Sequence, residues 1–499
     1  MANDKTRIFK ALSGAVGAEH ASIDAEVLYS YSRDTISPLT GDFAPDYVVR
    51  PGNRDEVQRV VRIAAENKIP MYTINGGTNQ CGMALANAGG IQVDMRRMNR
   101  IIEISEESMA ATFEPAVRWR ELDTEANKKG LYLDLPMAPY SGTPVGSWLS
   151  WNVSIYMGFG PTDKVLSLEV VLPNGEILTT GSSAYAPHES LNPYLREAYG
   201  PDLTGLFRGS YGAFGIVTKA TMALHPLYEV QSRIDIGHED IESAVNTLQN
   251  IARWNFQRFI VMYNRQMMTK CCAPDLSKLE NDKKEHKRVS GLFPEYFISV
   301  GLNGVAKQVD LYKEMISELV VRNRGTILDP DNFEQQVKDN MDDFLPGAGK
   351  RTIRMMAPWN KCIVPNGFIP LHRIPAATHA VMQILEEMGY ADLISGESAS
   401  TMYTNPVTQH GRMAYLEFPL LYNPQVTETI QKVGEIGQRC LEVMRDKYGM
   451  SSNIYFPGYT PPLNPEYDAL LKGIKKYFDP QEIMAPGKLV VDGEALKLI

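Results

Sequence analysis

The stretch "INGGTNQCGMA" (residues 74–84) follows a short apolar run, carries three glycines and holds no charged side chain. A P-loop needs Lys-Ser or Lys-Thr after its glycines, and a dinucleotide fingerprint needs G-x-G-x-x-G opening a helix. Gly76 and Gly77 are adjacent, so neither pattern is met. An anion nest remains, in which backbone N–H groups turn inward and Thr78 and Asn79 add donors. A tight structural loop explains these residues about as well.

Three further stretches are also rich in small residues and typical of close backbone approach. They are "SGTPVGSW" (141–148), "FRGSYGAFGIVTKATMALHP" (207–226) and "FDPQEIMAPGKL" (478–489). Four such loops could surround one extended cofactor that contains phosphate.

The first 225 residues read as alternating short strands and helices. "NRDEVQRVVRIAAENK" (53–68) predicts a helix capped by Asn53, with an apolar stripe at the i, i+3, i+4 and i+7 positions. "SLEVVLPNGEILTT" (167–180) predicts a hairpin in which Asn174 and Gly175 both take positive φ. After about residue 227, strands alternate with long helices, which indicates an α+β domain with one sheet.

Composition narrows the class of protein. The chain has 499 residues, 44% of them hydrophobic and 22% charged, with a formal net charge of -9. The lack of a long basic block argues against a nucleic-acid partner. No segment reaches the roughly 18 apolar residues that span a bilayer, and the N-terminus lacks a signal-peptide core. We therefore expect a cytoplasmic protein without a membrane partner.

The five cysteines lack metal-ligand spacing and suit a reducing compartment. For the adjacent Cys271 and Cys272, two free thiols are favoured over a strained disulfide.

The ordered combination of these loops, the "LEVVLPNGE" hairpin and the closing "DPQEIMAPGK" resembles the vanillyl-alcohol oxidase and p-cresol methylhydroxylase (PCMH) family of FAD-linked oxidoreductases. The resemblance runs from about Asp46 to Lys488. It implies an α+β fold with a two-subdomain FAD-binding domain of the PCMH type and a cap domain built on an antiparallel sheet. The expected limits are 1–227 for the FAD-binding domain, 228–463 for the cap, and 464–499 for a segment returning to the FAD-binding domain.

The resemblance also implies which residues hold FAD. The first loop would bind the pyrophosphate, the second would run beside the flavin and its ribityl chain, and the third would flank the adenine end. Lys488 would help to close the site. The expected cofactor residues are Asn75, Gly76, Gly77, Thr78, Asn79, Gln80, Ser141, Gly142, Thr143, Gly146, Gly215, Ile216, Val217 and Lys488.

Two branches of the family differ in the cap. Relatives that oxidise 2-hydroxy acids usually carry a histidine-rich metal pattern there. His372 and His379 have Pro375 between them and no obvious third ligand, so we expect no metal site. "WNKCIVPNGFIPL" (359–371) and "HGRMAYLEFPLLYNPQ" (410–425) are more similar to the branch that oxidises 4-alkylphenols.

Several positions depart from that branch. Cys81 stands where its oxidases bind a phenolate with tyrosine, and the Met137–Ala138 region stands where they place an aspartate near the flavin. Ile369 stands at the position of the histidine that bonds covalently to flavin, with His372 three residues on. We therefore expect non-covalent FAD. The Tyr-Arg pair near the C-terminus is replaced by "NIYFPGY" (453–459).

A phenolate still needs hydrogen-bond donors in an apolar pocket. The candidates are Tyr455, Tyr459, Arg354, His410 and Arg412. In a strand through "GRMAYLEF" (411–418), Met413, Tyr415 and Glu417 share a face. If that face lines the cavity, Glu417 would suit a catalytic base. The alternative is that Glu417 pairs with a basic residue across the sheet and Tyr415 is a core residue.

The leading hypothesis is an FAD-dependent oxidoreductase that removes hydride from a benzylic or allylic carbon of a small aromatic, para-substituted phenolic substrate. Its expected catalytic residues are Glu417, Tyr415, His410, Arg412 and Tyr455. A dehydrogenase of a 2-hydroxy acid or other alcohol is the first alternative, and a flavin-free binding protein that kept the fold is the second. We further expect a homo-oligomer, a dimer or larger.

Overall fold

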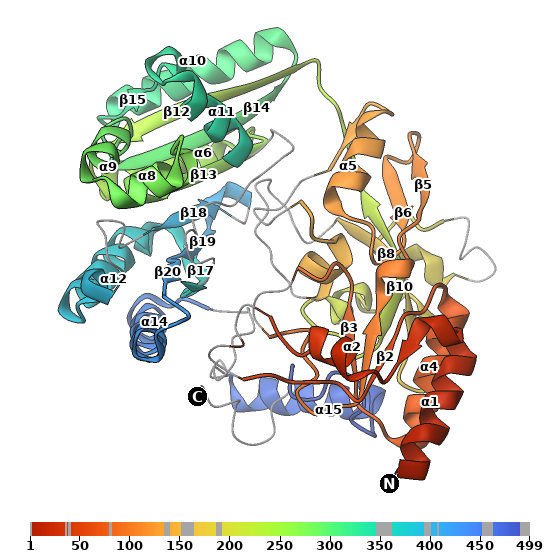
Figure 1. The fold of residues 1–499 in the computed structure, drawn as a ribbon. Coiled ribbons are helices and arrows are strands. Elements are labelled where there is room, and N and C mark those ends of the chain that lie inside the picture. Colours follow the sequence, from red (N-terminus) through yellow and green to blue (C-terminus); the bar gives the residue numbers. More distant parts are fainter. Residues whose placement is uncertain are drawn as a thin grey trace.

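The fold is described from a computed structural model. It describes residues 2–34, 37, 41–78, 82–133, 140–150, 164–185, 192–345, 362–393, 401–406, 409–451 and 463–489. The chain has the expected α+β fold, in which helices pack on three larger sheets (Figure 1).

The first sheet has the order β1-β2-β4-β3, with β1 (Ala21–Ser22), β2 (Tyr47–Val49), β4 (Ile91–Asp94) and β3 (Met71–Ile74). β4 runs parallel to both β2 and β3. Helix α4 (Arg54–Asn67) crosses between β2 and β3, and its N-cap Asn53 accepts a hydrogen bond from the backbone N–H of Glu56. Its apolar stripe is fully buried against α1 (Ala2–Val16), as the periodicity predicts.

The second sheet is antiparallel, with the order β5-β6-β10-β8-β9. Its strands are β5 (Ile101–Ser105), β6 (Ala110–Phe113), β10 (Ile216–Ala223), β8 (Val165–Val171) and β9 (Ile177–Thr179), and α5 (Trp119–Asn127) packs in its core. The predicted hairpin joins β8 to β9, but only Gly175 takes a positive φ, of 82°. The expectation for Asn174 was wrong because Pro173 fixes a negative φ at the first turn position, which favours a type I turn followed by glycine.

The third sheet has seven strands in the order β15-β12-β14-β13-β18-β19-β17, and its neighbouring strands run antiparallel. The strands are β15 (Thr326–Ile327), β12 (Val230–His238), β14 (Tyr296–Gly304), β13 (Phe259–Asn264), β18 (Tyr403–Pro406), β19 (Met413–Glu417) and β17 (Asn366–Pro370). Shorter strands pair as β7 (Leu131–Tyr132) with β11 (His225–Pro226) and β16 (Cys362–Ile363) with β20 (Leu420–Leu421).

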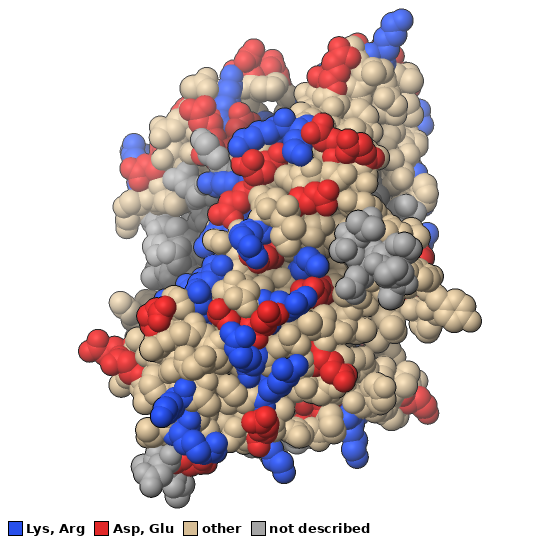
Figure 2. Space-filling model, turned by 90° about the vertical axis from the view of Figure 1, so that its right-hand side faces the viewer, with Lys and Arg blue, Asp and Glu red and all other residues tan. Residues whose placement is uncertain are grey.

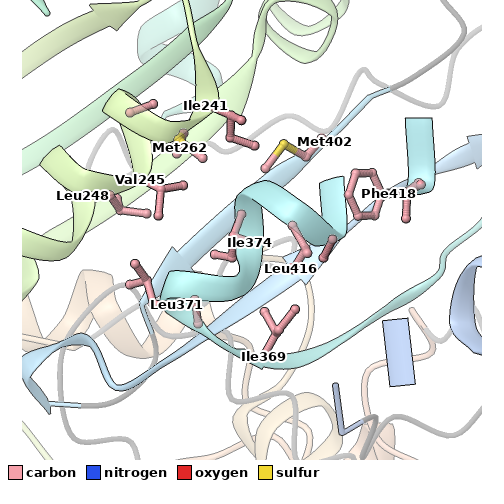
Figure 3. Close-up of a cluster of buried hydrophobic side chains, with 14 of the residues drawn as sticks. Ile241, Val245, Leu248, Met262, Ile369, Leu371, Ile374, Met402, Leu416 and Phe418 are labelled. Atoms are coloured by element: carbon pink, nitrogen blue, oxygen red, sulfur yellow. The ribbon is translucent and has the colours of Figure 1, made fainter. Parts of the chain in front are cut away.

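The two faces of this sheet carry separate cores. One core packs on α6 (Ile241–Trp254), α10 (Ala306–Arg322), α12 (Ile374–Glu387), α13 (Tyr390–Leu393) and α14 (Thr427–Tyr448). Met262, Leu416 and Ile374 belong to this core (Figure 3). The other packs on α7 (Arg265–Cys272), α8 (Leu276–Asn281), α9 (Lys283–Ser290) and α11 (Gln335–Phe344). Cys271 and Cys272 are buried in this second core as thiols rather than as a disulfide.

The last described helix, α15 (Pro465–Phe478), returns to the N-terminal part of the molecule (Figure 1). Its side chains Leu471, Ile474 and Phe478 join the core of the second sheet, and the Phe478 ring lies 5.5 Å from the ring of Phe214. We propose domain limits at residues 227 and 463, which fall between β11 and β12 and ahead of α15.

The surface charges are mixed. On the face shown in Figure 2, basic and acidic side chains are interspersed. Within the ranges given above, no helix combines the length and the apolarity needed to cross a bilayer.

Candidate cofactor site and buried carboxylate

The first glycine loop leaves the carboxyl end of β3, where ligands of sheets with parallel strands commonly bind. Gly77 takes φ 68°, a conformation that favours glycine and turns successive N–H groups toward one side. Asn75, Gly76 and Thr78 lie beside it, whereas Asn79, Gln80 and Cys81 lie outside the described residues.

The second glycine loop packs directly on the first. A Cβ atom on Gly76 would lie 3.0 Å from Thr143 Cγ2 and 3.7 Å from Gly142 Cα. A Cβ on Gly146 would lie 2.8 Å from Thr143 Oγ1 and 3.4 Å from Asn75 Cβ. The lack of side chains on these two glycines therefore brings the loops into contact. Thr143 Oγ1 also accepts a hydrogen bond from the Gly146 N–H at 3.1 Å. Ser141, the remaining predicted residue of this loop, is exposed.

A cavity connects these two loops with the third. It holds about 320 Å³ of empty space, including the space at its mouth, and its lining includes Asn75, Val145, Gly215, Ile216 and Val217. Residues from three of the four predicted loops thus line one cavity. The lining includes Gly212 and Gly215, at which a cofactor could approach the main chain closely.

The fourth loop closes on the segment that follows the first. Lys488 is buried, and its Nζ donates hydrogen bonds to Gly82 O and to Asn87 Oδ1, both at 2.7 Å. Burial lowers the pKa of Lys488 to about 7, although Asp34 acts in the opposite direction. Lys488 therefore ties the fourth loop to the segment that follows the first, and its role in closing the cofactor site stays a prediction.

Arg96 is a candidate cofactor-binding residue that the sequence did not suggest. It follows β4, and its Nη1 lies 3.8 Å from where a Cβ of Gly77 would stand. Its Nε and Nη2 donate to the buried Asp94 carboxylate, which also accepts from Tyr31. Burial alone would raise the pKa of Asp94, but these hydrogen bonds overcome it and hold that pKa below its usual value. The position at the carboxyl end of a parallel strand was the available signal.

The seven-stranded sheet holds a buried carboxylate. Glu417, the last residue of β19, is 6% exposed, and its Oε2 accepts hydrogen bonds from Tyr415 Oη at 2.6 Å and Tyr403 Oη at 2.8 Å. Tyr415 and Tyr403 belong to the core on the α7 and α11 face, and the ring of Phe368 lies 5.7 Å from that of Tyr415. Glu417, Tyr415 and Met413 therefore share a face as the strand periodicity predicts.

His410 and Arg412 lie at the other end of β19. Both are exposed, and His410 Nδ1 contacts Arg253 O at 2.9 Å. At about 3.3 Å per residue, Arg412 and Glu417 are some 16 Å apart along the strand. The structure thus does not bring His410 and Arg412 to the carboxylate.

Other predicted positions are placed only in part. Ile369 is fully buried in the core opposite the Glu417 face, and His372 is exposed. The remaining residues named from the sequence, Met137, Ala138, Arg354, Tyr455 and Tyr459, lie outside the described residues.

Comparisons with known proteins agree with this architecture. Residues 45–181 match the model of the FAD binding domain family. The glycolate oxidase subunit GlcD of Bacillus subtilis is 34% identical over 42% of this chain and 43% of its own length. The flavoprotein subunit of 4-cresol dehydrogenase from Pseudomonas putida is 28% identical over 48% of this chain and 45% of its own length. The matched segments thus span less than half of either relative.

A solved structure of substrate-bound p-cresol methylhydroxylase superposes with a TM-score of 0.82, at 18% identity, over 99% of this chain and 98% of that one. This likeness concerns the fold of both halves of the chain. Taken with the matched domain, it shows that the chain carries an FAD-binding domain within a fold similar to that of p-cresol methylhydroxylase.

Proposed function

We propose that this enzyme oxidises a small aromatic, para-substituted phenolic substrate by removing hydride from its benzylic or allylic carbon. The observation that carries the proposal is the buried Glu417, held by two tyrosine hydroxyls among aromatic rings in the cap. A carboxylate in an apolar, aromatic setting suits a planar substrate that must lose a proton as well as a hydride.

FAD, when bound, supplies the acceptor for the hydride and its two electrons. The chain's own residues would do the rest. Asn75, Gly77 and Thr143 would hold the cofactor through backbone and short polar groups. Tyr403 and Tyr415 would orient Glu417, whose carboxylate would take up the proton of the substrate hydroxyl. Loss of one hydride and one proton balances a two-electron oxidation of the substrate.

A 2-hydroxy acid is the second candidate substrate. The relative named as a glycolate oxidase subunit, at 34% identity, favours it. Within the described part of the chain, no group of three or more His, Cys, Asp or Glu side chains is arranged to hold a metal ion.

An anaerobic substrate screen separates the two candidates. The yellow holoprotein is mixed in turn with p-cresol, 4-ethylphenol, glycolate and D-lactate while the flavin absorbance is followed. We expect the phenols to bleach the flavin and the hydroxy acids to leave it oxidised. Bleaching by glycolate or D-lactate alone would replace the first proposal with the second. A preparation that stays colourless after addition of FAD would refute both.

We further propose that the enzyme is cytoplasmic and forms a homo-oligomer, a dimer or larger. Light scattering of the purified holoprotein is expected to give at least twice the mass of one 55.7 kDa chain. A mass of a single chain across the working concentration range would contradict the oligomer.

A further inference from the structure

The segment that follows α15 is hydrogen-bonded into the strand that carries the first glycine loop. The Met71 N–H donates to Ile483 O at 2.7 Å, and the Ala485 N–H donates to Met71 O at 2.9 Å. Met484 thereby pairs with Met71 in a parallel bridge. Because β3 runs from Met71 directly into the loop, this segment sets the position of one wall of the cofactor cavity.

A buried ion pair at the end of α15 organises the same segment. Asp479 is fully buried and Lys475 is 9% exposed, with Lys475 Nζ 2.5 Å from Asp479 Oδ2. The carboxylate also accepts from the Ile483 N–H at 3.1 Å and the Met484 N–H at 2.7 Å. Such a pair is costly to break, because removal of one partner leaves a buried charge.

The same ammonium group reaches the third glycine loop, which also lines the cavity. Lys475 Nζ donates to Met484 O at 2.7 Å and to Ala213 O at 2.9 Å. Ala213 lies between Gly212 and Gly215 of the third glycine loop, and both of these glycines line the cavity. Together with the hydrogen bond to Asp479, these bonds use all three N–H donors of Lys475. This one side chain therefore connects the third loop to the segment paired with β3.

We propose that Lys475 and Asp479 are positioning residues for FAD, which set the spacing between the first and third glycine loops. Neither residue lines the cavity. The proposal rests on this cavity being the FAD site and is independent of which substrate is oxidised. Loss of the pair lets the third loop move relative to β3, so cofactor affinity falls although every predicted FAD-contacting residue is retained.

The test uses the full-length protein freed of flavin and the variants Lys475→Met, Asp479→Asn and the double variant. The double variant leaves no unpaired buried charge, so it is the version expected to keep its fold. Lys472→Met is the matched control, because Lys472 lies on the same helix, is partly exposed and pairs with Asp468. Circular dichroism and thermal unfolding of the flavin-free proteins check folding before titration.

Binding of FAD, ADP and riboflavin is then measured, the first and last by flavin fluorescence and ADP by calorimetry. We expect the double variant to bind FAD and ADP at least tenfold more weakly, riboflavin within twofold, and the control to match the wild type for all three. An equal loss of affinity for riboflavin would indicate that the whole domain is destabilised, and it would overturn the proposal. FAD affinity within twofold of the wild type in a folded double variant would also overturn it.

Discussion

Replacement of Gly76 by alanine should weaken FAD binding through one identifiable contact. The added Cβ would lie 3.0 Å from Thr143 Cγ2 and 3.5 Å from Thr143 N, and Gly76 does not take a positive φ, so backbone strain contributes nothing. Overpacking of this kind costs about 1–3 kcal/mol. If that cost separates the two loops that hold the cofactor, FAD should bind about 5- to 150-fold more weakly.

The source of the effect is tested by rescue. Thr143→Ser removes Cγ2, the closest atom, while its hydroxyl can still accept from the Gly146 N–H. The double variant Gly76→Ala/Thr143→Ser should therefore recover most of the lost affinity. Gly14→Ala is the control, because nothing lies within 4 Å of its added Cβ and Gly14 is in helix α1. Fluorescence titration of flavin-free protein measures each affinity.

Two results would refute this reasoning. Wild-type FAD affinity in Gly76→Ala would mean that the two loops are not held together at the cofactor. A loss in Gly76→Ala that persists unchanged in the double variant would mean that Cγ2 of Thr143 is not the obstacle.

Four further predictions concern single side chains. Arg96→Gln should weaken the binding of FAD and ADP about 10- to 100-fold through loss of a charge-assisted contact. Arg97→Gln is the control and should keep both affinities, because the Arg97 side chain points to the β2–α4 segment. Equal affinities of the two variants in calorimetry would contradict this prediction. Burial lowers the pKa of Lys488 from 10.5 to about 7. The folded state therefore has its full stability above pH 10.5 and loses up to about 5 kcal/mol of it as the pH falls towards 7. Lys488→Met should flatten the pH dependence of the thermal midpoint over this window, and an unchanged slope would argue against the shifted pKa. Glu417→Gln should slow anaerobic flavin reduction by about 10²- to 10⁴-fold, measured by stopped flow, with less than a tenfold loss excluding Glu417 as the base. Because the expected anchoring position is the apolar Ile369, acid precipitation should leave FAD in the supernatant, and flavin retained on the polypeptide would show a covalent bond.

Local features of the fold follow from local sequence. The stripe of α4 and its Asn53 cap are confirmed because a helix of period 3.6 brings those residues to one side wherever it packs. The alternation in β19 likewise places Tyr415 and Glu417 on one face. The expectation for Asn174 failed at the same local level, since the restriction that Pro173 places on the turn was overlooked.

The candidate site is harder to predict because its contacts join distant segments. Strand alternation says nothing of the surroundings at the two ends of β19, so His410 and Arg412 were grouped with Glu417 although they are exposed at the opposite end. Arg96 reaches Gly77 only because β3 and β4 run parallel and end together. Lys475 and Asp479 are one helical turn apart, yet the contact with Ala213 spans 262 residues.

The sequence by itself predicted the kind of cofactor and the order of its loops, because the ordered combination of local motifs resembles one known family of flavoproteins. Tertiary structure alone decided which loops meet. The sheet order β1-β2-β4-β3 places the first loop at a sheet edge, and pairing of the Ile483–Ala485 segment with Met71 brings the C-terminal segment against it. These contacts depend on hydrogen bonds and close packing between segments far apart in the chain, which no local pattern encodes.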